Sequence, residues 1–299
     1  MPALRHAILG AGGVGGVMAA FLAHLGESVT LVVRPESVAN YPADIQLESP
    51  FGNFHASVAH DKTVPPCDVL WITVKATQLD AALKAVPNSD TAQTIIPLLN
   101  GIDHIDVLRA KFGEQRVIAA TIAGEMERVA AGQFVHRTSF LVLNVASSGR
   151  DLLSNAMDGL QKMGLQCRFF DDEPTLMWSK MVFLAPIALS TTAGDLTVGG
   201  VRDDPAWRNL WESCVHEACS VATVEGAKVD PNAVIQRMGQ VPAAMRSSMQ
   251  KDVERGSPPE LDAIAGPILR GGTRHRIPTP ATETLAAAVE HKSATRPVV

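Results

Sequence analysis

Residues 7–16 read AILGAGGVGG, and this stretch decides the fold of the first part of the chain. An apolar run from Leu4 to Leu9 predicts a buried strand, and an apolar pattern from Val17 to Leu25 predicts a helix. Between them are three glycines at G-x-G-x-x-G spacing: Gly10, Gly12 and Gly15. Such glycines permit a tight turn, close approach of the backbone to a pyrophosphate, and close packing of helix on strand. The stretch therefore favours a nucleotide-binding turn at a helix N-terminus over a glycine-rich turn without a ligand.

Strand and helix patterns alternate over the first 170 residues. Strands are predicted at residues 4–9, 28–33, 68–74, 95–99, 117–123 and 166–170. Two short alternating stretches, Ile45 to Glu48 and Phe54 to Val58, predict a β-hairpin. Alternation of this kind is typical of an α/β fold, and we expect a doubly wound parallel sheet of the Rossmann type.

The pattern changes near Asp171, and from Pro174 onward strand signals disappear. Helices are predicted at residues 175–192, 207–226, 231–240, 260–270 and 281–291. We therefore expect two domains, an α/β domain at 1–170 and an all-helical domain at 171–299. Trp207 and Trp211 lie four residues apart on one predicted helix. They are compatible with a homodimer interface, but core packing explains them equally well.

The composition excludes several classes of function. The 299 residues are 46% hydrophobic and 19% charged, as in an ordinary globular protein with an ample core. A formal net charge of −5, with no basic run, argues against a nucleic-acid-binding surface. No span of about 18 apolar residues is free of charged or turn residues, so we expect no membrane helix.

Two further features predict a cytoplasmic location. The first strand pattern begins within a few residues of Met1, so we expect no signal peptide. The four cysteines are scattered and lack zinc-type spacing, which predicts free thiols in a reducing compartment and no metal site.

Arg34 follows the second predicted strand, where dinucleotide folds distinguish NAD from NADP. An acidic residue there accepts hydrogen bonds from the adenosine ribose, whereas a basic residue accommodates a 2′-phosphate. Pro35 comes next and Glu36 lies further on, so no carboxylate directly neighbours the guanidinium. An ordinary surface arginine is the alternative. Beside the glycine turn we interpret Arg34 as a 2′-phosphate contact and predict NADPH or NADP⁺ as the cofactor.

Polar residues also follow two other predicted strands. Lys75 directly follows the predicted strand at 68–74, and Asn100 directly follows the one at 95–99. Ligands of open α/β sheets bind outside the carboxyl ends of the strands. Either residue alone is compatible with an ordinary strand terminus, but together with Arg34 they favour a cofactor or substrate crevice.

Lys180 lies in a helix pattern that is apolar nearly all round, and burial is expected. A lysine there either extends its stem until the ammonium reaches the surface, or faces a cleft and exchanges a proton with a carbonyl. The residues alone leave both interpretations open. Pro186 in the same helix removes a backbone donor and predicts a kink.

Glu260 also has two interpretations. Residues 257–260 read SPPE, which fits a capping box with Ser257 at N-cap and Glu260 at N3 of a helix. The spacing alone favours this cap over a functional carboxylate.

Several motifs follow the glycine turn in a characteristic order: Val74-Lys75-Ala76-Thr77-Gln78, Leu99-Asn100-Gly101, Trp178-Ser179-Lys180, Ser247-Ser248-Met249, Asp252 and Glu260-Leu261-Asp262. Their order and spacing resemble those of the ketopantoate reductase (2-dehydropantoate 2-reductase) family over nearly the whole chain. The resemblance implies a Rossmann domain that binds NADP and a helical substrate and catalytic domain similar to that of 6-phosphogluconate dehydrogenase. It also implies reduction of 2-dehydropantoate to (R)-pantoate with NADPH, a step toward pantothenate.

Carried over to this chain, the resemblance implies roles for single residues. Lys180 would donate a proton to the reduced ketone oxygen, and Glu260 would hold substrate and lysine in place. Ser248 would contact the substrate carboxylate, and Asn100 would line the substrate cleft. The implied cofactor contacts are Gly10, Gly12, Gly13, Val14, Gly15, Arg34, Lys75, Asn100, Ala123 and Glu260.

Leu184 and Ala188 depart from the family pattern, which carries asparagines four and eight residues after the lysine. The substrate contacts expected from this helical face are therefore absent. Because an apolar residue cannot select for a substrate hydroxyl as an amide can, the keto acid is left open. The first hypothesis is 2-dehydropantoate, the second a different and more apolar 2-oxo acid. A non-catalytic NADP-binding sensor is a third, and the retained Lys180 and Glu260 argue against it.

Overall fold

The computed structural model describes residues 3–295, and the chain divides into two compact units. The first, here called the sheet unit, comprises the residues up to Leu99 together with His104–Asp171. The second, the helical unit, comprises Asn100–Asp103 and the residues from Asp172 onward. No sequence pattern indicated that the short segment Asn100–Asp103 would belong with the helices.

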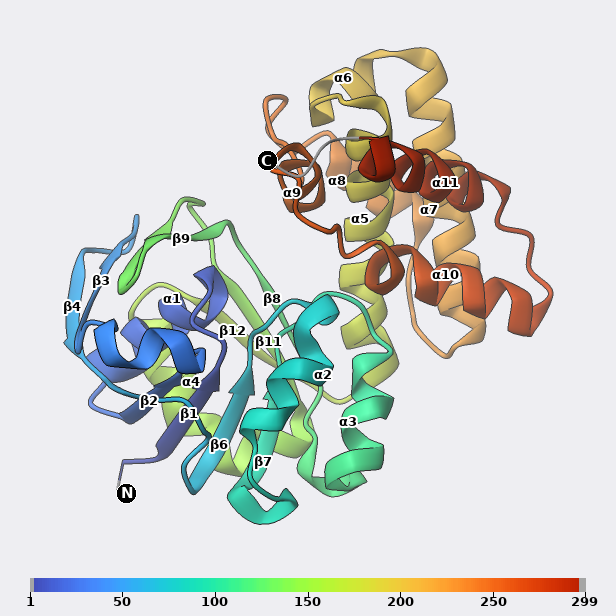
Figure 1. Ribbon diagram of the computed structural model, residues 1–299. Helices are drawn as coiled ribbons and strands as arrows, with labels where there is room; N and C mark the ends of the chain where they lie inside the picture. The colour runs from blue at the N-terminus through green and yellow to red at the C-terminus, as the bar shows by residue number, and fades with distance from the viewer. Residues whose placement is uncertain (1–2, 296–299) are drawn as a thin grey trace. The chain divides into compact units, whose positions relative to one another are not determined.

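The sheet unit is built on five parallel strands in the order β5-β2-β1-β6-β7 (Figure 1). Their bounds are β1 Arg5–Leu9, β2 Ser28–Val32, β5 Ala59–Asp61, β6 Cys67–Ile72 and β7 Ala92–Pro97. β1 pairs with β2 on one side and β6 on the other, and its Ala7 and Ile8 have no exposed surface. Strands buried on both faces are rich in apolar residues, as the central strands β1 and β6 are, whereas the edge strand β5 is polar and largely exposed. The order confirms the predicted parallel, doubly wound sheet.

Helices and two smaller sheets complete the sheet unit. The helices are α1 Gly13–His24, α2 Leu79–Ala82, α3 His104–Phe112 and α4 Arg150–Lys162, with 3₁₀ turns η1 Pro35–Asn40, η2 Ala76–Gln78, η3 Leu83–Ala85, η4 Ser89–Thr91, η5 Glu114–Arg116 and η6 Ser147–Gly149. The smaller sheets have the orders β4-β3-β10-β9 and β12-β11-β8. Their strands are β3 Asp44–Glu48, β4 Phe54–Ser57, β8 Ala120–Ala123, β9 Met126–Ala130, β10 Gln133–His136, β11 Val142–Ala146 and β12 Gln166–Phe170. β3 and β4 are antiparallel, which confirms the predicted hairpin.

The helical unit contains α5 Glu173–Gly194, α6 Val198–Asp203, α7 Pro205–Val224, α8 Pro231–Met238, α9 Ser248–Glu254, α10 Leu261–His275 and α11 Pro280–Thr295. The sequence patterns predicted all of these except α6 and α9. Both are short, with six and seven residues, so a helical period is hardly visible in them.

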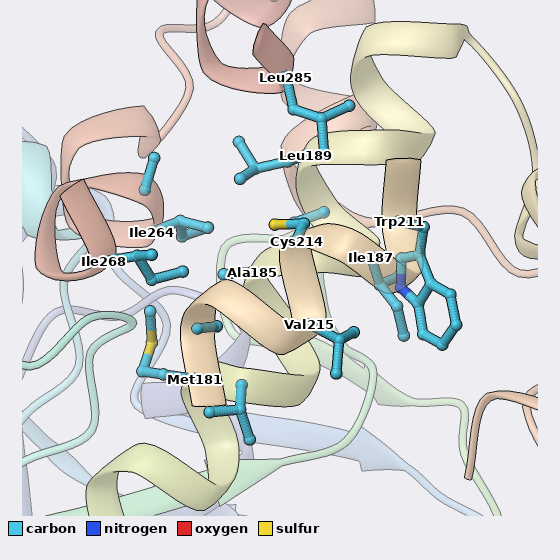
Figure 2. Packing of buried hydrophobic residues seen from close by; sticks show 14 of the residues in the cluster. Met181, Ala185, Ile187, Leu189, Trp211, Cys214, Val215, Ile264, Ile268 and Leu285 are labelled. Carbon is cyan, nitrogen blue, oxygen red and sulfur yellow. The ribbon is translucent and has the colours of Figure 1, made fainter. Parts of the chain in front are cut away.

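α5 is the central helix of this unit, and other helices pack around it. Figure 2 shows Met181, Ala185 and Leu189 of α5 among apolar side chains of α7, α10 and α11. Trp211 of α7 is also buried in this core. A helix surrounded on most sides is apolar all round, which explains its sequence.

α5 also has the length and composition of a membrane-crossing helix, contrary to the expectation that no span would be apolar enough. Within the described residues it is the one helix that does so, and 72% of the apolar window is buried inside the structure. Core helices of globular proteins pass the same test, so this is weak evidence for a membrane.

The capping box expected at Ser257 is wrong. α10 begins at Leu261, so Glu260 is the N-cap residue and makes no side-chain cap hydrogen bond. Pro258 and Pro259 explain the difference, because a residue that precedes proline is disfavoured in the helical region. The carboxylate of Glu260 is thereby available for contacts other than a cap.

Candidate active site and cofactor site

The glycine turn joins β1 to α1 as the spacing predicted. Gly10 has a φ of +113°, a backbone conformation that favours glycine. A Cβ on Gly15 would lie 2.0 Å from the carbonyl oxygen of Gly10, and one on Gly16 would lie 2.0 Å from the ring of Phe134. Side chains at these positions would therefore push α1 off the strands beside it.

Gly12 differs from these glycines because a Cβ there would meet nothing within 4 Å. It is the N-cap residue of α1, and the first turn of the helix contains no acidic residue. Gly13 and Val14 follow as the first residues of the helix, with N–H groups that lack helical partners. Open space in front of a helix N-terminus without a carboxylate fits an anionic group such as a pyrophosphate.

Two more of the expected cofactor residues lie at the same edge of the central sheet. Arg34 is exposed and follows β2, and Lys75 is partly buried and follows β6. Both strands pair with β1, so their carboxyl ends flank the glycine turn. Ala123 is the last residue of β8 and belongs to the separate three-stranded sheet.

Within the helical unit the structure brings together Asn100, Lys180 and Glu260. Lys180 Nζ donates to Asn100 Oδ1 at 2.9 Å, and Asn100 Nδ2 donates to Glu260 Oε2 at 3.0 Å. An ammonium only donates and a carboxylate only accepts, so the two partners determine the orientation of the amide. Asn100 therefore connects a cation and an anion whose sequence positions are 80 and 160 residues away from its own.

Lys180 has an altered acidity in this arrangement. Burial lowers the pKa of its ammonium to about 8, while the charge of Glu260 opposes that change. Glu260 is itself buried, with 7% of its surface exposed. A lysine with such a pKa is charged at neutral pH and releases its proton far more readily than an ordinary lysine.

The other expected substrate residues lie on α5 and α9. Leu184 is partly buried and Ala188 is buried, one and two helical turns beyond Lys180 on the same face. Ser248 is exposed and is the first residue of α9. Neither Leu184 nor Ala188 has a polar side-chain atom to offer a substrate.

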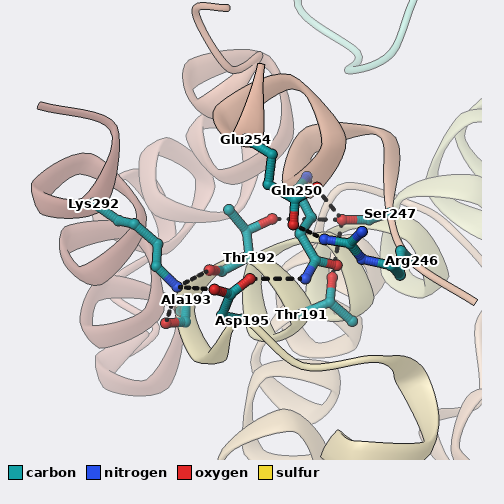
Figure 3. Close-up of polar contacts among 9 residues, drawn as sticks. All are labelled: Thr191, Thr192, Ala193, Asp195, Arg246, Ser247, Gln250, Glu254 and Lys292. Carbon is teal, nitrogen blue, oxygen red and sulfur yellow. Dashed lines mark hydrogen bonds and ion pairs between the residues drawn. The ribbon is translucent and has the colours of Figure 1, made fainter. Parts of the chain in front are cut away.

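A polar network with a buried centre at Thr191, Ser247 and Gln250 holds α9 against the end of α5 (Figure 3). The Ser247 hydroxyl accepts from the backbone N–H of Gln250 and lies 2.9 Å from Thr191 Oγ1 in a hydrogen bond. Gln250 Nε2 donates to Asp195, and Lys292 Nζ donates to the carbonyl of Thr192. This network places Ser248. No helix was predicted at these residues, although the S-x-x-Q spacing of Ser247 and Gln250 is a helix-start signal.

Two family models match the chain. One describes "Ketopantoate reductase PanE/ApbA" and matches residues 6–145, and the other describes "Ketopantoate reductase PanE/ApbA C terminal" and matches residues 174–293. The chain belongs to the ketopantoate reductase family. This membership makes it an oxidoreductase of a type that carries out NAD(P)-dependent reduction.

The individual relatives share only about a quarter of their residues with this chain. An uncharacterized oxidoreductase YkpB of Bacillus subtilis is 27% identical, covering 96% of this chain and 98% of the relative. A 2-dehydropantoate 2-reductase of Caulobacter vibrioides is 26% identical, covering 94% and 96%.

Solved structures agree with the fold. A PanE/ApbA family ketopantoate reductase from Ralstonia eutropha has a TM-score of 0.86 at 25% identity, with 97% of this chain and 99% of that chain covered. A D-mandelate dehydrogenase, solved with NADH and anilino(oxo)acetate, has a TM-score of 0.85 at 20% identity, with 98% and 99% covered. At that identity the second likeness concerns the fold alone.

Proposed function

We propose that the chain reduces 2-dehydropantoate to (R)-pantoate with NADPH in the cytoplasm. The observation that carries the proposal is the hydrogen-bonded series Lys180–Asn100–Glu260. A charged lysine with a lowered pKa, oriented by an amide and a buried carboxylate, is the group that a ketone reduction needs as its acid. Family membership supports the same chemistry.

The residues of the chain have separate tasks in this proposal. Gly12, Gly13 and Val14 bind the pyrophosphate of the cofactor through the N-terminus of α1. Arg34 binds the 2′-phosphate, and Lys75 lies at the same sheet edge. When bound, reduced nicotinamide supplies a hydride for the ketone carbon.

The helical unit supplies the proton. Lys180 donates a hydrogen bond to the ketone oxygen and then transfers a proton to it, so that a hydroxyl group forms. Asn100 and Glu260 orient the ammonium, and the negative charge of Glu260 stabilises its charged form. Ser248, at the start of α9, binds the substrate carboxylate.

A second candidate substrate is a more apolar 2-oxo acid, and a specific observation favours it. Leu184 and Ala188 line the helical face beyond Lys180 with apolar groups only. Such a surface gives no preference for a substrate with an additional hydroxyl over one without it. The chemistry of Lys180 is the same for both substrates.

Steady-state kinetics on a panel of 2-oxo acids test these candidates. NADPH oxidation is followed at roughly 340 nm, the absorption of the reduced nicotinamide, with ketopantoate and with unbranched, branched and aromatic 2-oxo acids. The highest kcat/KM for ketopantoate would support the proposal, and ketopantoate among the poorest substrates would contradict it. NADPH binding without turnover of any 2-oxo acid would instead favour the sensor hypothesis.

Leu184→Asn is expected to shift this preference. An amide at this position can hydrogen-bond a substrate hydroxyl, so the ratio of kcat/KM for ketopantoate to that for its deoxy analogue should rise about tenfold. Leu210→Asn, in α7 of the same unit, is the control for a polar substitution at a partly buried leucine. An equal ratio in the Leu184→Asn variant and the parent would mean that this face does not contact the substrate.

The Arg34→Ala substitution is expected to weaken the binding of NADPH and to leave the binding of NADH unaffected. A hydrogen bond between a guanidinium and a phosphate contributes about 1.5–3 kcal/mol, so KM for NADPH should rise roughly 10- to 100-fold. Arg116→Ala removes a different surface arginine of the same unit, paired with Asp90, and serves as the control. An unchanged ratio of NADPH to NADH efficiency in the Arg34→Ala variant would remove Arg34 from the cofactor site.

A further inference from the structure

Asn100–Asp103 is a short segment of the helical unit that lies, in sequence, between two elements of the sheet unit. β7 precedes it and α3 follows it. Since Asn100 hydrogen-bonds both Lys180 and Glu260, the position of this segment decides whether the three groups meet. What holds the segment in place is therefore a question about the reaction as well as the fold.

Gly101 brings the segment against α10. It has a φ of +92°, and a Cβ there would lie 2.6 Å from the carbonyl oxygen of Ala263. The next residue, Ile102, packs against the apolar core of the helical unit. The backbone of the segment thus lies directly on the first turn of α10, which follows Glu260.

Pro267 leaves a backbone carbonyl in this turn of α10 without its helical hydrogen-bond donor. A proline has no N–H, so the carbonyl four residues earlier loses its helical donor, and the ring pushes against that carbonyl. The carbonyl four residues before Pro267 is that of Ala263, the group that Gly101 approaches. Gly101 therefore packs against the same carbonyl that Pro267 leaves without a helical donor.

Arg270 holds the far end of the segment. Its Nη1 donates to Asp262 at 2.6 Å, and its Nη2 pairs with Asp103. A Cβ on Gly266 would lie 2.2 Å from Nη2, so the guanidinium lies over that glycine. Because helix side chains lean toward the N-terminus, Arg270 reaches back along α10 to the turn on which the segment rests.

We propose that Arg270 and Gly266 of α10 are positioning residues, which hold the Asn100–Asp103 segment so that the Asn100 amide stays between Lys180 and Glu260. Exposed ion pairs contribute little to stability, and Arg270, Asp103 and Asp262 are all substantially exposed. The effect of the pairing is on the geometry of Asn100. The expected effect on turnover rests on the proposed function, whereas the titration of Lys180 that tests this inference does not.

Two variants disturb the contact in different ways. Arg270→Met removes the guanidinium, whereas Gly266→Ala keeps it and displaces it, since only the end of a flexible side chain must move. Alanine is the better helix former, so Gly266→Ala should melt at the parent temperature or above. Arg274→Met removes a cation from the same helix that pairs with Glu225 and serves as the control.

The primary readout is the titration of Lys180 itself. Lysine amines of the full chain are labelled with acetic anhydride across a pH series, and the Lys180 peptide is followed by mass spectrometry. Loss of the Asn100 acceptor should lower the pKa of Lys180 by about half a pH unit in both variants. Removal of a nearby cation alone would raise it, so a decrease is specific to a displaced amide.

Turnover should follow the titration. With the best substrate, kcat should fall about tenfold in Arg270→Met and Gly266→Ala and stay at the parent value in Arg274→Met. A Lys180 pKa equal to that of the parent in both variants would overturn the proposal, as would an equal shift in Arg274→Met. A parent chain that reduces no 2-oxo acid would defeat the proposed function alone, because the labelling needs no substrate.

Discussion

Lys180→Ala is expected to lower kcat for 2-oxo acid reduction by about 10²-fold or more, the contribution of a positioned general acid. The variant loses the proton donor and leaves Asn100 and Glu260 without the cation they orient. NADPH affinity should stay close to that of the parent, since the glycine turn belongs to the sheet unit. Stopped-flow measurement of one turnover, together with an NADPH titration, separates the two effects.

Lys180→Arg distinguishes proton donation from charge. Arginine retains the positive charge, but its pKa is far above that of lysine, so it does not release a proton at neutral pH. We expect kcat of the Lys180→Arg variant to remain far below that of the parent, as in Lys180→Ala. Lys228→Ala, a lysine of the same unit whose side chain is 85% exposed and paired with Asp172, is the matched control. Near-normal turnover in the Lys180→Ala variant would mean that another group donates the proton.

The same assignment predicts the pH profile of the reduction. Lys180 must be protonated to donate, and its pKa is about 8. In the parent, kcat should therefore be high below pH 8 and decline above it, whereas an ordinary lysine would sustain the reaction to about pH 10. The oxidation of the product alcohol should show the opposite trend, because it needs the neutral amine.

Gly12→Asp is expected to abolish cofactor binding without harming the fold. Gly12 is the N-cap residue of α1 with extended backbone, and a Cβ there meets nothing within 4 Å. Aspartate is a good N-cap and suits the helix dipole, so the melting temperature should not fall. A carboxylate facing a pyrophosphate costs several kcal/mol, so the Kd for NADPH should rise at least about 100-fold.

The Gly15→Ala substitution, in contrast, is expected to lower the stability of the fold. Its Cβ would lie 2.0 Å from the backbone oxygen of Gly10, so the fold itself must shift, at a cost of about 1–3 kcal/mol. Melting curves and NADPH titrations on both variants separate a ligand contact from a packing requirement. Parent-like NADPH affinity in the Gly12→Asp variant would contradict the assignment of the turn to the pyrophosphate.

The sequence by itself determined the features that depend on near neighbours in the chain. The glycine spacing between an apolar strand and an apolar helix predicted the turn at Gly10, Gly12 and Gly15. The alternation of strands and helices, and its end near Asp171, predicted the parallel sheet and the helical second half. These signals are local, because a strand repeats every two residues and a helix every 3.6. The shortest elements, such as α6 and α9, gave too few repeats to be found.

Tertiary structure alone decided the chemistry that these elements carry. The local pattern placed Glu260 at N3 of a capping box, but two prolines delayed the start of the helix to Leu261, and the Glu260 carboxylate instead accepts a hydrogen bond from Asn100. It also decided that Asn100 follows a strand of the sheet unit yet belongs with the helices, and that Lys180 has a pKa of about 8. Burial and partners come from residues 80 and 160 positions apart, and no local period contains that information.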